Sequence, residues 1–169
     1  MKRFFLFLII TLICLSCTIE NHFLPVINGK LCYSDTTIVK ENVSVKLTNL
    51  CFQGYVYEPF TNVEITNRSN QHLSLNTEKF VLVINDDTTT TNKNLIKNIN
   101  LEPNEKINLE LMYTNADLHR YYNFEKKIKV KVKLLLNNIK LNNKVVSFPE
   151  IFFVPEDSTE YKNHTFLTN

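Results

Sequence analysis

Apolar and polar residues alternate with a period of two in one segment of this chain after another. Val43, Val45 and Leu47 alternate with polar neighbours, as do Val63 and Ile65. Further alternating segments span 107–113 and 126–136, a continuous apolar run spans 80–84, and a last strand is expected over 145–154. Since successive side chains of a β-strand point to opposite faces, this period predicts strands. We therefore expect an all-β fold, a single antiparallel two-sheet sandwich.

The predicted strands differ in how they are buried. Residues 80–84 are apolar throughout, which predicts burial on both faces, and Pro149 limits the last strand to an edge or a bulge. The chain has only 2 Gly, and Asn clusters at the breaks between apolar segments. Asn tolerates the backbone conformations of tight turns, so these residues are expected to supply the turns.

The first sixteen residues have the pattern of a secretory signal peptide. Lys2 and Arg3 precede an apolar run over 4–13, and the small residue Ser16 follows. A transmembrane helix needs about 20 apolar residues, so this run is too short to span a bilayer. The rest of the chain is expected to work on the exported side of a membrane.

The end of this leader, Leu15-Ser16-Cys17, resembles the signal of bacterial lipoproteins. The resemblance implies that Cys17 is linked to diacylglycerol, carries acyl chains such as palmitate, and anchors the protein to a membrane of the cell envelope. Cys14 departs from the family, which usually has Leu, Val or Ile there. The alternative is ordinary cleavage after small residues at 14 and 16, which would release the protein into the periplasm or the medium.

These features divide the chain into four parts. We expect a signal peptide over 1–16, a tether over 17–28, one sandwich domain over 29–156 and a polar tail over 157–169. The chain has 19 basic and 17 acidic residues, and loss of Lys2 and Arg3 leaves 17 of each sign. A neutral body does not indicate nucleic acid as a partner.

Two cysteines remain after the leader and Cys17 are set aside. Cys32 and Cys51 would close a loop of about 20 residues, and a disulfide there would contribute about 3 kcal/mol in an oxidising compartment. The alternative is two buried thiols, since Cys also serves as a small apolar core residue. These two cysteines form no CxxC pair and the histidines are dispersed, so we expect no metal and no cofactor.

The region from about 43 to 154 resembles the immunoglobulin-like domains of bacterial surface and periplasmic proteins. Two segments carry the resemblance, Val63-Glu64-Ile65-Thr66-Asn67-Arg68-Ser69-Asn70 and Leu101-Glu102-Pro103-Asn104-Glu105-Lys106. In the family the second often reads Leu-x-Pro-Gly-Glu; here Asn104 replaces the Gly, and Asn can also adopt the left-handed conformation. The resemblance implies a fold and no activity.

No catalytic motif was found, and we expect no enzyme. Asp86 and Asp87 open a polar run over 86–94 that is expected to be a flexible hairpin loop, with a calcium site as the alternative. Lysines at 127, 129, 131 and 133 alternate along the predicted strand over 126–136. They are expected to form a solvated face, with an anionic partner as the alternative.

Two aromatic segments are the candidate contact sites. The first contains Phe52, Tyr55, Tyr57 and Phe60, and the second contains Arg120, Tyr121 and Tyr122. Tyr and Arg are favoured at binding surfaces, and connections between strands are where such domains place recognition. The alternative is that most of these rings fill the core.

We therefore expect a non-enzymatic, membrane-anchored envelope lipoprotein that binds another envelope protein or supports envelope assembly. The alternative is a secreted or anchored module that binds peptides or glycans through the aromatic connections. The absence of Trp counts against glycans, because Trp offers the largest flat stacking surface. The sequence does not predict an oligomeric state.

Overall fold

A computed structural model describes residues 21–33, 35–52, 58–92, 97–113 and 131–156. In this part of the chain the regular structure is β-strand, with one short 3-10 turn, η1 (Thr77–Lys79), and no α-helix. Every strand pair is antiparallel, as expected. The described residues include no helix long and apolar enough to cross a membrane. The all-β prediction is confirmed.

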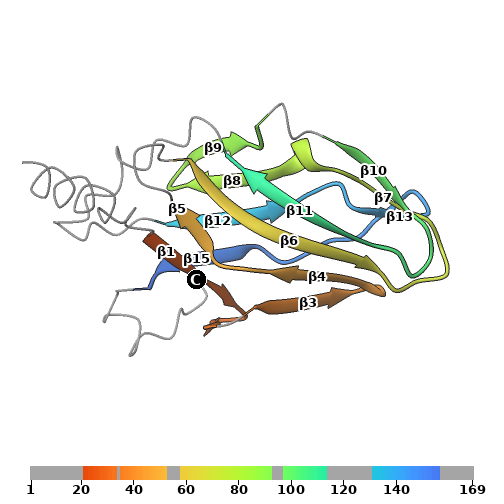
Figure 1. The fold of residues 1–169 in the computed structure, drawn as a ribbon, viewed down its shortest axis with the longest axis horizontal. Coiled ribbons are helices and arrows are strands. Elements are labelled where there is room, and N and C mark those ends of the chain that lie inside the picture. The colour runs from red at the N-terminus through yellow and green to blue at the C-terminus, as the bar shows by residue number, and fades with distance from the viewer. Residues whose placement is uncertain (1–20, 34, 53–57, 93–96, 114–130, 157–169) are drawn as a thin grey trace, which may run out of the picture.

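Eleven of the strands form one large, open sheet (Figure 1). Nine of them follow the order β3 (Thr36–Lys40), β4 (Val43–Leu47), β6 (Pro59–Asn67), β5 (Leu50–Phe52), β1 (Asn21–Ile27), β15 (Ile151–Pro155), β12 (Val132–Leu136), β8 (Phe80–Ile84) and β9 (Asp87–Thr90). In addition, β11 (Lys106–Met112) pairs along its whole length with residues 60–66 of β6, and β2 (Lys30–Leu31) pairs with β1.

A second sheet of four strands covers one end of the molecule (Figure 1). Its order is β10 (Asn98–Leu101), β7 (Leu73–Asn76), β13 (Lys140–Leu141) and β14 (Lys144–Val145). The strand predicted over 145–154 is therefore two strands, β14 and β15, separated by residues 146–150. Pro149 lies in this gap, and proline cannot donate to a strand ladder.

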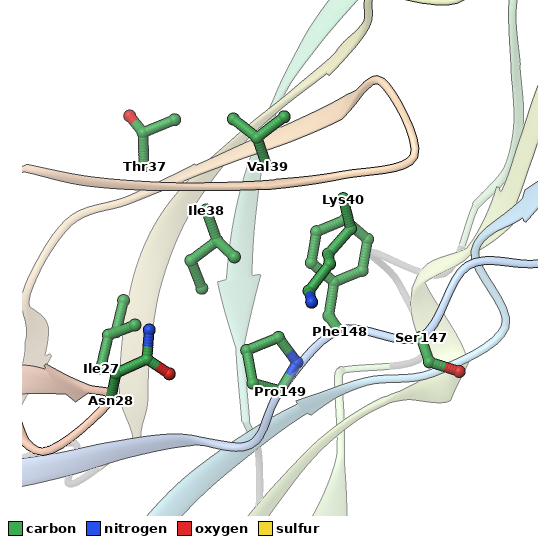
Figure 2. Close-up of a pocket in the computed structure, with 9 residues that line it drawn as sticks. All are labelled: Ile27, Asn28, Thr37, Ile38, Val39, Lys40, Ser147, Phe148 and Pro149. Atoms are coloured by element: carbon green, nitrogen blue, oxygen red, sulfur yellow. The ribbon is translucent and has the colours of Figure 1, made fainter.

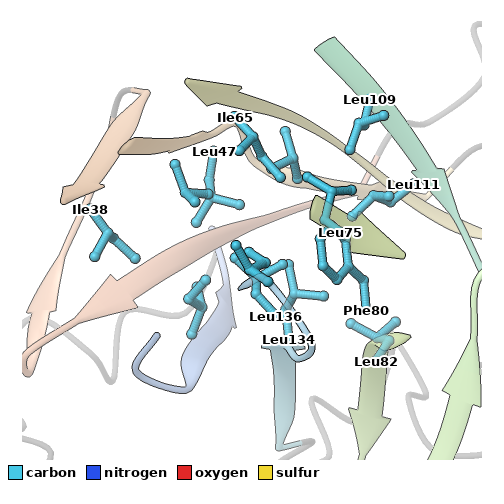
Figure 3. Close-up of a cluster of buried hydrophobic side chains, with 14 of the residues drawn as sticks. Ile38, Leu47, Ile65, Leu75, Phe80, Leu82, Leu109, Leu111, Leu134 and Leu136 are labelled. Carbon is cyan, nitrogen blue, oxygen red and sulfur yellow. The ribbon is translucent and has the colours of Figure 1, made fainter. Parts of the chain in front are cut away.

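One apolar core lies between strands from the two halves of the large sheet (Figure 3). Ile65 of β6 and Leu111 of β11 come from one side, and Leu82 of β8 and Leu134 of β12 come from the other. All four side chains are almost completely buried. Along each of these strands every second side chain points to the same face, and this alternation directs the four side chains into the core.

The first strand differs from the sequence-based prediction. Residues 21–27 were expected in the tether, but they form β1, which pairs with β5 on one edge and with β15 on the other. Phe23 and Leu24 are each only 1% exposed. The domain therefore includes these residues, because removing them would open a gap between β5 and β15.

Asparagine supplies many of the turns, as predicted. Seven described asparagines have positive φ, including Asn104 at 67°. Paired examples are Asn28-Gly29 between β1 and β2 and Asn142-Asn143 between β13 and β14. Two consecutive residues with positive φ are what a type I′ hairpin turn requires, and asparagine tolerates this region better than most residues.

A buried asparagine links two of the turns through side-chain hydrogen bonds. Asn67, at the end of β6, donates from Nδ2 to the carbonyl oxygens of Gln71, Leu101 and Glu102 at 2.7, 3.2 and 3.1 Å. Its Oδ1 accepts from the backbone nitrogen and the hydroxyl of Ser69 at 3.1 and 2.7 Å. The two segments that carry the family resemblance therefore meet at this side chain.

Candidate functional site

An open groove lies along the side of β3 that faces away from β4 (Figure 2). Its volume is about 510 Å³, within the usual range of ligand sites. Its lining comes from the end of β1, from β3 and from the segment between β14 and β15: Ile27, Asn28, Thr37, Ile38, Val39, Lys40, Ser147, Phe148 and Pro149. The groove is thus bounded by two parts of the chain far apart in sequence.

The hairpin of β3 and β4 forms one wall. Ile38 pairs with Val45 and Lys40 pairs with Val43. Figure 2 shows Ile38 and Lys40 pointing toward Pro149 and Phe148, whereas Thr37 and Val39 point to the other side of the strand. The alternation of β3 therefore presents one apolar and one cationic side chain to the groove.

The opposite wall is irregular. Val146 is held by a backbone hydrogen bond to the carbonyl oxygen of Ile139 at 2.8 Å, and β15 begins at Ile151. Ser147, Phe148 and Pro149 lie between these points and form no strand. Because Pro149 has no N–H, this wall cannot supply a complete ladder of hydrogen bonds to β3.

The apolar part of the groove is the margin of the protein core. Ile38 is a core residue with 8% exposure, and Ile27 and Phe148 pack against the core while remaining partly exposed. Val39, at the rim, is 52% exposed. A partner with apolar side chains could therefore extend the core at this point.

Charges beside the groove are mostly paired. Lys46 lies 2.7 Å from Asp35, and Lys144 lies 3.5 Å from Glu41. The hydrogen bond and the negative charge of Asp35 raise the pKa of Lys46. Lys40 is the charged residue of the lining, and it forms no ion pair with any other residue that the structure describes.

The predicted aromatic contact surface lies largely outside the described residues. This applies to Tyr55, Tyr57, Arg120, Tyr121 and Tyr122. Phe52 ends β5, where it pairs with Pro59, and the structure describes its backbone only.

Phe60 is the member of this surface whose side chain is described. It is half-buried in β6, and its register neighbours are Cys51 of β5 and Met112 of β11, which are half-buried as well. The backbone nitrogen of Tyr113 donates to the carbonyl oxygen of Pro59 at 2.9 Å. The end of the first aromatic segment, at Phe60, therefore lies beside Tyr113, from which the chain continues to the second segment.

The structure does not bring Cys32 and Cys51 together, and no disulfide joins them. The backbone nitrogen of Cys32 bonds to the carbonyl oxygen of Pro25, whereas Cys51 pairs with His22 further back along the same edge of β1. Three residues of strand separate these positions by about 10 Å and place them on opposite faces. A disulfide needs Cα atoms within about 7 Å, so the predicted bridge does not fit this register.

Other polar candidates have structural roles. Asp87 begins β9, which pairs with β8, so the run expected to be a loop from Asp86 is partly strand. Lys133 of the predicted lysine stripe lies 2.9 Å from Glu150. In the described ranges no three His, Cys, Asp or Glu residues gather as metal ligands would.

A buried tyrosine has no partner for its hydroxyl group. Tyr113 follows β11, is completely buried in the core, and its Oη forms no hydrogen bond within the described structure. Burial raises the pKa of this phenol, because the charged form would lose its hydration. Sequence alternation predicted this residue as an inward strand position but could not show that its hydroxyl would be unsatisfied.

The groove itself was not predicted from the sequence. Its residues come from a hairpin and from an irregular segment more than a hundred positions later, and Thr36–Lys40 has no apolar–polar alternation that would have marked β3 in the sequence. No protein-family model, no curated protein and no solved structure matches this chain.

Proposed function

We propose that this chain is a membrane-anchored envelope protein that works by binding another envelope protein. The observation that carries the proposal is the groove beside β3, where the margin of the core is open next to a strand that pairs on one side only in the described structure. The lining exposes more polar than apolar surface, so a partner there would make polar contacts beside the apolar ones with Ile27, Ile38 and Phe148.

The fold that presents this groove is proposed to be an immunoglobulin-like sandwich. Support comes from the antiparallel pairing throughout and from a single core to which β4, β6 and β11 contribute from one side and β8, β12 and β15 from the other. Sandwiches of this architecture serve many binding proteins, so the fold is compatible with the proposal without identifying the partner.

The lipid anchor at Cys17 would place the domain close to the bilayer. Because β1 begins at Asn21, only residues 18–20 separate it from the anchor, which spans at most about 14 Å. The groove contains Ile27, at the other end of β1, about 20 Å further along the strand. A partner in the envelope could therefore reach it.

The anchor is tested by metabolic labelling with a fatty acid. Cys17→Ala should abolish the label and release the protein from membranes. Cys14→Ala should retain the label and the membrane association, because Cys14 leaves with the leader. Label that persists in Cys17→Ala contradicts the anchor and supports ordinary secretion.

The contact site is tested by photo-crosslinking in cells. A photoreactive residue is placed at Thr37 or at Ser147, on the two walls of the groove, and at Thr90 of β9 as the control. We expect the same envelope protein to be captured from both walls and not from Thr90. Equal capture from Thr90 contradicts the site, and adducts of the chain with itself alone indicate a self-interface instead.

A peptide- or glycan-binding module remains the second candidate. The observation that favours it is the common starting point of the aromatic connections at Phe60 and Tyr113. Binding to a glycan array that is lost in Tyr55→Ala but kept in Lys40→Glu would favour this function over the first.

A further inference from the structure

The edges of the large sheet differ in what they offer to another strand. In the described part of the chain β3, β9 and β11 each pair with one neighbour in this sheet. β11 exposes Lys106 and Glu110, and β9 contains only Asp87 and threonines. Charged and polar side chains discourage pairing at an edge. β3 also carries two threonines and Lys40, but it differs in having an apolar side chain, Val39, exposed beside the groove.

We propose that β3 accepts an extended segment of the partner protein as an added antiparallel strand. The segment has apolar side chains at alternate positions, which enter the groove, and one carboxylate that lies beside Lys40. This inference rests on the proposed function, because it specifies how the partner occupies the same groove.

The geometry of β3 determines which side chains of the added strand would be buried. Side chains of paired strands keep the same alternation, so those beside Ile38 and Lys40 point into the groove and those beside Val39 point away. The inward set meets Ile27, Phe148 and Pro149 (Figure 2). Main-chain hydrogen bonds to β3 give affinity in such complexes, and alternate side chains give specificity.

The opposite wall explains why the site is open to a foreign strand. The segment with Pro149 has no strand conformation and lacks one N–H, so it leaves β3 without a regular neighbour on that side in the described structure. A segment bound there therefore forms its backbone hydrogen bonds with β3 and makes apolar contacts with Phe148 and Pro149.

Charge specifies one feature of the partner. Lys46 and Lys144 already lie beside Asp35 and Glu41, whereas Lys40 has no such neighbour among the described residues. A carboxylate on the inward face of the added strand, at the position that pairs with Lys40, would form an ion pair with the Lys40 ammonium group. The partner segment is therefore apolar, extended and acidic at one inward position.

The test begins with random nine-residue peptides displayed on phage and selected on the full chain in detergent. We expect enrichment of peptides with apolar residues at alternate positions and an Asp or Glu. Lys40→Glu should shift the enriched charge to Lys or Arg, and Lys79→Glu, an exposed position on η1, should not. An unchanged thermal unfolding midpoint shows that both variants remain folded.

Backbone pairing is tested with synthetic copies of an enriched peptide, each N-methylated at one residue. Strand addition predicts that methylation lowers affinity at least about tenfold at every second residue, through loss of a hydrogen bond to β3, and changes it little between them. A flat profile, or no enrichment, overturns strand addition. If crosslinks from Thr37 and Ser147 still capture one partner, the proposed function stands without it.

Two other occupants give distinct results in the same experiment. If residues 157–169 of this chain fill the groove, peptides are enriched only after the tail is removed. If a second copy fills it, the chain is a dimer that Lys40→Glu disrupts. Either result overturns the proposal.

Discussion

The side-chain amide of Asn67 lies 3.2 Å from the carbonyl oxygen of Leu101, a residue 34 positions later, and donates a hydrogen bond to it. Asn67 is completely buried and also bonds to Gln71 and Glu102. One side chain thus joins carbonyl groups from two turns, and those of Gln71 and Glu102 accept in addition from the Ser69 hydroxyl and the Glu105 backbone nitrogen.

Asn67→Ala should destabilise the protein strongly. The substitution removes the five hydrogen bonds of the Asn67 side chain, each of which contributes about 0.5–1.5 kcal/mol. We expect the free energy of unfolding, measured with urea, to fall by about 3 kcal/mol or more. Asn70→Ala, at an exposed position in the same turn, is the control and should change it by less than about 0.5 kcal/mol. Equal effects of the two substitutions would show that the network contributes nothing.

Tyr113→Phe should be neutral or stabilising. The hydroxyl group is buried and has no hydrogen bond to any described residue, so its removal relieves a desolvation cost of about 1–3 kcal/mol while the ring still fills the core. Urea unfolding at pH 7 is the measurement. A loss above about 1 kcal/mol would show that the hydroxyl has a partner in solution, such as a buried water.

The same substitution has a pH signature. The pKa of Tyr113 is raised in the folded state, so the folded chain keeps this proton at pH values where the unfolded chain, with a pKa of about 10, loses it. The contribution of this group to stability is therefore fully present below pH of about 10 and is lost as pH rises from there through the raised pKa. Relative to Tyr113→Phe, the unmodified chain should lose about 1.4 kcal/mol per pH unit in this window. Parallel stability curves for the two chains would contradict the raised pKa.

Cys32 and Cys51 should remain thiols in the folded protein. Their positions along β1 differ by three residues and face opposite sides, so oxidation requires the strands to separate first. Alkylation of the unfolded chain without reductant, followed by mass spectrometry, should label both residues. A chain whose Cys32 and Cys51 take up label only after reduction would show that the register of β2 or β5 differs.

A chain that begins at residue 29 should fail to fold. It lacks β1, which lies between β5 and β15 and contributes Phe23 to the core. We expect a chain beginning at residue 18 to show a cooperative thermal transition by circular dichroism and the shorter chain to show none. Identical transitions would place the domain boundary after β1, as the sequence alone suggested.

Alternation predicted the strands that have one buried face. The segments at 43–47 and 63–65 correspond to β4 and β6, and β11 spans most of 107–113, whereas β8 was predicted from the continuous apolar run over 80–84. The strand predicted over 126–136 is described only in its second half, β12. These predictions hold because burial of one residue in two is a local property of the sequence.

Other elements depend on information that alternation does not contain. The position of residues 17–28 directly after the leader suggested a tether, yet β1 is flanked on both edges by strands from distant parts of the chain. Asn28-Gly29, with φ of 51° and 74°, was an available signal, because this dipeptide between apolar segments predicts a hairpin. The groove could not be predicted, since it arises where Pro149 interrupts a strand that alternation had extended across it.

Hydrogen exchange of the β3 backbone is the most direct test of the central claim. The full chain is compared with and without a peptide enriched on it, and β9 serves as an edge strand outside the groove. The account predicts that the peptide slows exchange of amides in Thr36–Lys40 and leaves Asp87–Thr90 unchanged. Slower exchange at β9, or no change at β3, would contradict it.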